Sequence, residues 1–264
     1  MATVATTPAA SLRAEFARIF HDPSDTLGTL TFNAVLVFAL WYLAPRALFF
    51  DLTGPEGLPY ALAGWMFADV CATNILAPDR TRALLALGDR DELVRFLRAK
   101  SFALWLLVGP ACAVLAVFLA VDDHDWRGVT VVMLSVTVVP FGAITLSNVI
   151  GFALPYHPRP LRWRWEQRAR TKQVVVRWAI LLVIPYAIYP AAAAAVVAIP
   201  LGLWRLTRHL PIGTDAKDAD FILCALMVAA ISMAVWIYGY RLLARWATRD
   251  TTRLRRYLEN LEMG

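Results

Sequence analysis

The sequence lacks the motifs that mark the common nucleotide-binding and hydrolytic enzymes. It has no GxxxxGKS/T loop for the phosphates of ATP, no HExxH pair for zinc, no GxSxG nucleophile turn and no glycine fingerprint for a dinucleotide. Its four histidines are scattered, without the spacing of metal ligands. We therefore expect no catalytic residue, no bound cofactor and no metal in this chain, which argues against an enzyme.

Cysteine is also scarce. The three cysteines, Cys71, Cys112 and Cys224, lie in separate apolar runs and form no CxxC pair. Three cysteines at this spacing predict no disulfide framework. We expect each of them to be a small residue that packs between helices. The first 26 residues are polar or amphipathic, without an early apolar core and cleavage site, so we expect no signal peptide.

Charge is the third scarcity. Only 17% of the residues are charged, while 59% are hydrophobic and the mean hydropathy is +0.55. A soluble domain carries about 25% charged residues. The low share of charged residues and the high share of apolar ones therefore predict that part of the protein surface contacts a lipid bilayer. The net charge of +6 could indicate nucleic acid. Because the arginines flank apolar runs instead of covering one polar face, we expect no nucleic-acid partner.

Six long apolar runs follow one another along the chain. A helix needs about 20 residues to cross about 30 Å of hydrocarbon, and continuous runs favour helices over a β-barrel. The sequence therefore predicts an all-α, polytopic membrane protein with a tail at 1–26, a six-helix domain at 27–240 and a helical tail at 241–264. The runs are Leu27 to Ala44, Leu58 to Ala77, Ser101 to Val121, Val129 to Leu154, Val174 towards Leu203, and Phe221 to Tyr240.

The distribution of basic residues predicts the orientation. The two tails and the loops after the second and fourth runs together carry 21 Lys and Arg, whereas the three remaining loops carry five. Positive charge concentrates on the cytoplasmic side of membrane proteins. We therefore expect both termini in the cytoplasm and the chain in the cytoplasmic (inner) membrane.

An interfacial helix is expected before the first crossing, from Ser11 to Phe20, with Ser11 as its N-cap. Its apolar face should lie on the inner leaflet, with the charged residues on the opposite face. An ordinary polar tail with some helix is the alternative. The apolar face comprises Leu12, Phe16, Ile19 and Phe20, and the charged face Arg13, Glu15 and Arg18.

The fifth run is irregular, because Pro185, Pro190 and Pro200 interrupt it. Its 30 residues would span about 45 Å as a helix, which exceeds one crossing. We expect a crossing to Pro190 followed by a short helix that re-enters the membrane from the outer face. A single long, kinked helix is the alternative.

One acidic residue, Asp69, lies about ten residues into the second run and so roughly 15 Å deep. Buried charges are costly and usually face a cavity or a partner. Asp69 could couple protons or contact a cationic substrate. It could equally be a hydrogen-bonded packing residue, with candidate partners Asn33, Thr73, Asn74 and Asn148.

The loop from Pro78 to Lys100 is the most informative polar stretch. Arg80 to Leu87 predicts a short helix capped by Gly88, and the spacing of Asp89 and Glu92 predicts the start of a second. The second helix has an apolar stripe that runs into the third crossing. The turn between them would present Leu84, Leu85 and Leu87 to a partner protein. An amphipathic loop resting on lipid headgroups is the alternative. The stripe comprises Leu93, Phe96 and Leu97.

This arrangement resembles the membrane subunit of ABC-2-type ABC exporters. The loop is similar to that family's loop in Asp79-Arg80, in the Leu-rich turn at 84–87 and in Lys100 at the membrane. Ser147-Asn148, followed by Leu154-Pro-Tyr-His-Pro, is similar to the stretch that ends the fourth segment in permeases of high-GC bacteria.

The resemblance implies a transport subunit that binds no cofactor itself, because ATP is bound by a separate ATP-binding subunit. The loop would be the coupling element, and a second membrane subunit, identical or homologous, would complete the path. A proton-coupled secondary transporter using Asp69 and a non-transport membrane scaffold remain alternatives. The coupling residues implied are Arg82, Leu84, Leu85, Leu87, Gly88, Asp89 and Glu92.

Overall fold

A computed structural model describes residues 7–43, 57–68, 70–123, 126–153 and 217–260, together with the single positions 155, 157 and 166. Every regular element in these ranges is helical. The all-α prediction is thus confirmed for the described part of the chain. The fifth run and its expected re-entrant helix lie outside the described residues.

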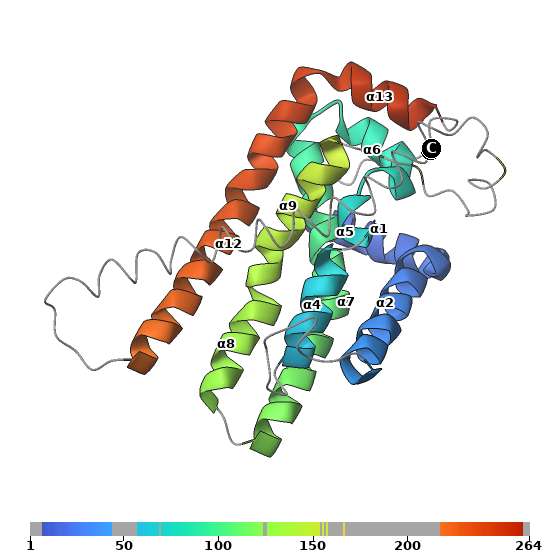
Figure 1. Ribbon diagram of the computed structural model, residues 1–264. Helices are drawn as coiled ribbons and strands as arrows, with labels where there is room; N and C mark the ends of the chain where they lie inside the picture. The colour runs from blue at the N-terminus through green and yellow to red at the C-terminus, as the bar shows by residue number, and fades with distance from the viewer. Residues whose placement is uncertain are drawn as a thin grey trace, which may run out of the picture.

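Six of the described helices run side by side as a bundle, and the remaining elements lie towards one end of it (Figure 1). α12 packs most extensively on α9, and α7 contacts α1, α4, α8 and α12. The bundle helices are α2 (Pro23–Leu43), α4 (Gly57–Ala68), α7 (Arg90–Asp123), α8 (Trp126–Thr137), α9 (Val139–Ala153) and α12 (Lys217–Arg249). The remaining elements are α1 (Pro8–His21), α5 (Val70–Thr73), η1 (Ala77–Asp79), α6 (Arg80–Ala86) and α13 (Thr251–Glu259).

Four stretches are long and apolar enough to cross a membrane: Thr26–Leu43, Arg90–Leu119, Val132–Ala153 and Ala225–Arg249. They coincide with the first, third, fourth and sixth predicted crossings. The second crossing is represented by α4 and α5, which are each shorter than a full span. The predicted boundaries at 26/27 and 240/241 fall inside α2 and α12, because both helices continue beyond their apolar runs.

Two apolar clusters hold the described helices together. One, the bundle cluster, joins α2, α4, α7, α8 and α9 around side chains such as Phe67 and Val136. The other, the α6–α13 cluster, joins α6, the start of α7, the end of α12 and α13 around Leu93, Leu97 and Leu258. Because the second cluster covers the short helices, it fixes α6 and α13 to the ends of the long ones.

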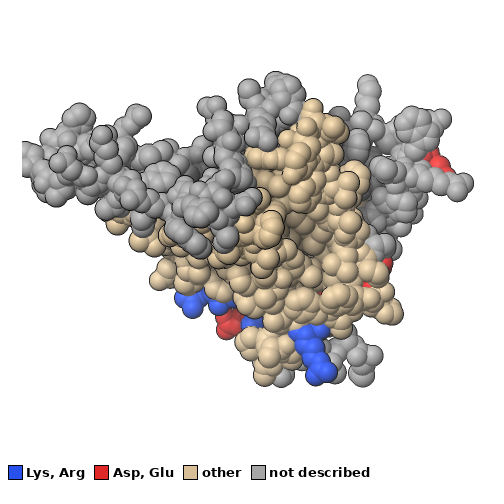
Figure 2. Space-filling view, turned by 90° about the horizontal axis from the view of Figure 1, so that it is seen from below, with Lys and Arg blue, Asp and Glu red and all other residues tan. Residues whose placement is uncertain are grey.

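Charge is distributed unevenly over the molecule. Seen from the end opposite α13, the described surface is almost entirely uncharged, with a few Lys and Arg side chains at one edge (Figure 2). The buried ion pairs and the exposed arginines of α13 lie instead towards the end where α1, α6 and α13 gather (Figure 1).

α1 differs from the sequence prediction in its cap and in its buried face. The helix begins at Pro8, and Thr7 Oγ1 accepts the Ala10 N–H at 3.2 Å. Proline fits the first helical position because no N–H is needed there, so the cap lies upstream of Ser11. The buried residues are Ser11, Glu15 and Ile19. The prediction that Glu15 lies on an exposed charged face is therefore wrong.

Candidate functional site

The turn between α6 and α7 presents one leucine, not three. Leu85 is 43% exposed, whereas Leu84 packs partly buried against the α6–α13 cluster. Leu87 is only 2% exposed and belongs to that cluster. The expectation that Leu87 faces a partner is wrong, because α13 and the end of α12 enclose the inner face of α6.

The local structure of the turn follows the sequence closely. α6 ends at Ala86, and the Gly88 N–H donates to the Leu85 carbonyl at 3.0 Å. Asp89 then caps α7, because its Oδ1 accepts the Asp91 N–H at 2.9 Å. Gly88 and Asp89 are exposed, and Glu92 is half-buried one turn into α7. The predicted helix–turn–helix is thus confirmed, but Leu87 and not Gly88 occupies the C-cap position of α6.

A buried ionic cluster joins α1 to the helices on both sides of this turn. Glu15 of α1 lies 3.0 Å from Lys100 Nζ of α7 and 2.6 Å from Arg18 Nη2. Arg82 of α6 reaches Glu15 at 3.5 Å and Asp79 at 2.8 Å. The side chains of Glu15 and Lys100 are only 3% and 6% exposed. Two separated segments are therefore tied by charges withdrawn from water.

The electrostatics of Glu15 follow from this geometry. Burial alone would raise its pKa, but the charge of Lys100 and the hydrogen bond and charge of Arg18 outweigh burial and lower the pKa from 4.5 to about 2. Glu15 therefore stays ionised throughout the physiological range.

A second polar network begins at Ser101, the residue after Lys100, and lies between α7, α9 and α12. Asn148 Nδ2 donates to Tyr240 Oη at 2.6 Å and to Ser101 Oγ at 3.3 Å. Ser101 Oγ also contacts Tyr240 Oη and donates to the Leu97 carbonyl at 2.9 Å. Asn148 Oδ1 is buried and has no partner among the described residues. The network fixes three long helices at one level.

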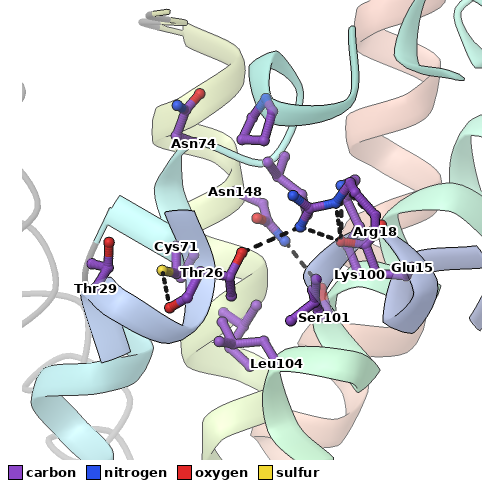
Figure 3. Close-up of a pocket in the computed structure, with 15 residues that line it drawn as sticks. Glu15, Arg18, Thr26, Thr29, Cys71, Asn74, Lys100, Ser101, Leu104 and Asn148 are labelled. Carbon is purple, nitrogen blue, oxygen red and sulfur yellow. Dashed lines mark hydrogen bonds and ion pairs between the residues drawn. The ribbon is translucent and has the colours of Figure 1, made fainter. Parts of the chain in front are cut away.

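A pocket opens between the two networks, lined by side chains from α1, α2, α5, α7 and α9 (Figure 3). It encloses about 40 Å³, room for a few water molecules. Glu15, Arg18 and Lys100 lie on one side and Cys71 on the other, with Thr26 and Asn148 between them (Figure 3). Cys71 Sγ contacts the Thr26 carbonyl at 3.9 Å. A polar pocket thus lies at the junction of α1 with the bundle.

The structure unites some of the predicted buried polar residues and separates others. Asn74 and Asn148 both line the pocket and are 6% and 0% exposed. Asn33 is buried on α2 but does not line it. Asp69 lies outside the described residues, so its role stays a prediction.

The sequence did not predict the roles of Glu15, at the centre of the ionic cluster, and of Tyr240, in the network with Asn148. Glu15 shares a face with Ser11 and Ile19 at positions i, i+4 and i+8, a spacing that could have marked it as buried. Tyr240 is fully buried, although the residue after it is the exposed Arg241. No local signal in the sequence pairs Tyr240 with Asn148.

Among the described residues, no group of three or more His, Cys, Asp or Glu side chains gathers in a way that could hold a metal ion. Comparison with known protein families, with curated proteins and with solved structures finds no match for this chain. A functional assignment has to be argued from the chain's own residues.

Proposed function

We propose that this chain is the membrane-spanning subunit of an ABC-type exporter, driven by a separate ATP-hydrolysing subunit that docks on residues 78–100. The observation that carries the proposal is the continuity of α7. This one helix of 34 residues begins at the exposed turn and runs into the third apolar stretch. At 1.5 Å per residue it is about 51 Å long, so a force at the turn acts directly on the membrane span.

The contacts around the turn also support a transfer of motion from the turn to the membrane-spanning helices. The Glu15–Lys100 pair ties α1 to α7, and the α6–α13 cluster ties α6 and α13 to α7 and α12. A displacement of the turn would therefore move α1, α7 and α12 together. Rigid tilting of packed helices between two states is a common device in transporters. The polar pocket lies at this joint and would change shape with it.

The topology belongs to the same proposal. α1, the α6–α7 turn and α13 lie towards one end of the described bundle, which supports placing both tails and the loop on one side (Figure 1). The excess of 21 basic residues over five favours the cytoplasm for that side. Six crossings of the inner membrane, with a second membrane subunit completing the path, remain our proposal.

The outward aromatic face of α1 fits contact with lipid in this arrangement. Phe16 and Phe20 stack with ring centres 6.3 Å apart, and Phe20 is 62% exposed. Glu15 points the other way, into the protein. α1 would thus rest on the inner leaflet by one face and hold α7 by the other.

The test is co-purification with a candidate ATP-hydrolysing subunit, taken from the genes adjacent to the gene of this chain. The purified chain alone should hydrolyse no ATP, and Leu85→Asp should abolish association because it places a charge at the exposed tip of the turn. Trp246→Asp is the matched control, since Trp246 is a 47% exposed apolar residue on the outer face of α12. It should leave association intact.

Association that survives Leu85→Asp would refute docking at the turn. If no ATPase associates, and Asp69→Asn instead removes the response of transport to a proton gradient, the secondary-transporter alternative replaces this proposal. Absence of both an ATPase partner and transport would favour a membrane scaffold.

A further inference from the structure

α13 is a short helix with two sharply different faces. Leu254, Tyr257 and Leu258 are buried in the α6–α13 cluster, whereas Arg255 and Arg256 are exposed. The apolar face is therefore already occupied by the protein itself. What α13 offers to its surroundings is its basic face.

The basic face adjoins the docking turn. α13 contacts α6, and a Cβ added at Gly88 would lie 3.9 Å from the guanidinium Nη2 of Arg255. Leu85, the exposed tip, is within three residues of Gly88 on the same turn. α13 and the turn after α6 thus lie next to each other at one end of the bundle (Figure 1).

The height of this surface separates it from the lipid headgroups. If the sixth crossing ends at Tyr240, the remaining nine residues of α12 extend about 13 Å beyond the hydrocarbon. If the third crossing begins at Ser101, the first eleven residues of α7 extend about 16 Å. The headgroup layer is roughly 5–8 Å thick on each side. Both α13 and the turn would stand in water above it.

The two exposed arginines of α13 place positive charge on this surface. Neither Arg255 nor Arg256 forms an ion pair with any residue of the described ranges. Of the acidic residues nearby, Glu259 ends α13, Asp89 follows Gly88 and Asp91 lies in the first turn of α7. A partner that places acidic groups opposite α13 would compensate the two guanidiniums.

We propose that the Arg255–Arg256 face of α13 is the second half of the docking surface for the ATP-hydrolysing subunit, and that it receives an acidic patch of that subunit. This inference rests on the proposed function and adds a partner chemistry to it. Leu85 supplies the apolar contact, and the two arginines fix the orientation and accelerate the encounter.

The experiment measures the affinity of the purified chain, in nanodiscs, for the ATP-binding subunit encoded beside its gene. Arg255→Glu/Arg256→Glu should weaken binding at least tenfold, and the wild-type affinity should fall as salt rises from 50 to 300 mM. The matched control is Arg245→Glu/Arg249→Glu, which makes the same change of charge on exposed positions of α12. It should alter the affinity less than threefold.

Three outcomes separate the hypotheses. If Leu85→Asp abolishes binding while the α13 double variant binds like wild type, the proposed function stands and the role of α13 is refuted. If neither variant changes the affinity, both fail. If the α13 variant loses thermal stability only in nanodiscs that contain phosphatidylglycerol, with unchanged subunit affinity, α13 contacts anionic lipid and the inference is overturned. An unchanged melting temperature in neutral nanodiscs establishes that the variant is folded.

Discussion

The buried pair between Glu15 and Lys100 gives the sharpest stability prediction. Glu15→Gln keeps the shape of the side chain but leaves Lys100, whose side chain is 6% exposed, with only the more distant carboxylate of Asp79 at 4.0 Å. Breaking such a pair by removing one partner costs about 3–5 kcal/mol. Because Glu15 is also the main link from α1 to α7, we expect the loss to appear first as detachment of α1.

Thermal unfolding in detergent and limited trypsin cleavage after Arg13 measure this effect. Arg13 is exposed on α1, so cleavage there should accelerate when α1 detaches. A double-mutant cycle with Lys100→Met isolates the pair, since replacing both charges by groups of similar volume is often nearly neutral. We expect the double variant to recover most of the stability. A coupling energy below about 0.5 kcal/mol would refute the reasoning.

The same pair predicts a pH dependence. The pKa of Glu15 is about 2 in the folded protein, against 4.5 for the free side chain. Between these values the unfolded chain binds more protons, so stability rises with pH in that window. The contribution, roughly 3 kcal/mol, is complete above about pH 4.5 and is lost as the pH falls towards 2. In a plot of melting temperature against pH, Glu15→Gln should reduce the fall between about pH 4.5 and pH 2. A fall as steep as in the wild type would show that Glu15 does not cause it.

Five substitutions test the packing by thermal melting and expression level. Leu87→Asp should destabilise the protein by about 3 kcal/mol or more, because Leu87 is 2% exposed, whereas Leu85→Asp should leave the fold intact. Gly151→Ala should prevent folding, because its Cβ would overlap the carbonyl oxygen of Thr73, while Gly64→Ala has open space and should be tolerated. Tyr240→Phe should cost about 1–3 kcal/mol by removing the acceptor of the Asn148 amide. Equal melting temperatures for Leu87→Asp and Leu85→Asp, for Gly151→Ala and Gly64→Ala, or for Tyr240→Phe and the wild type would contradict the packing described.

The features that depend on short-range chemistry were predictable from the sequence. Asp89 caps α7 because an Asp before a helix accepts a nearby backbone N–H, and that tendency needs no tertiary context. The stripe of Leu93, Phe96 and Leu97 predicted which face of α7 is buried, and all three are buried. Long apolar runs likewise predicted four of the helices that could cross a membrane.

The features that depend on distant partners were not predictable. Glu15 looks like a surface residue until Lys100, 85 positions later, lies beside it. Leu87 looks like an exposed tip until α13, about 165 positions later, covers it. Hydrophobic patterning reveals which residues avoid water but not which distant segment shields them. The helices on both sides of the turn were therefore predicted correctly, while the exposed part of the turn is smaller than expected.

The proposed contact between the ATP-hydrolysing subunit and the turn between α6 and α7 can be tested by photo-crosslinking. One variant carries a photoreactive amino acid in place of Leu85, and a second carries it in place of Tyr42, which is 72% exposed near the far end of α2. We expect a crosslinked product with the ATP-binding subunit from position 85 and none from position 42. Equal crosslinking from both positions, or none from position 85 in a complex that still co-purifies, would refute docking at the turn.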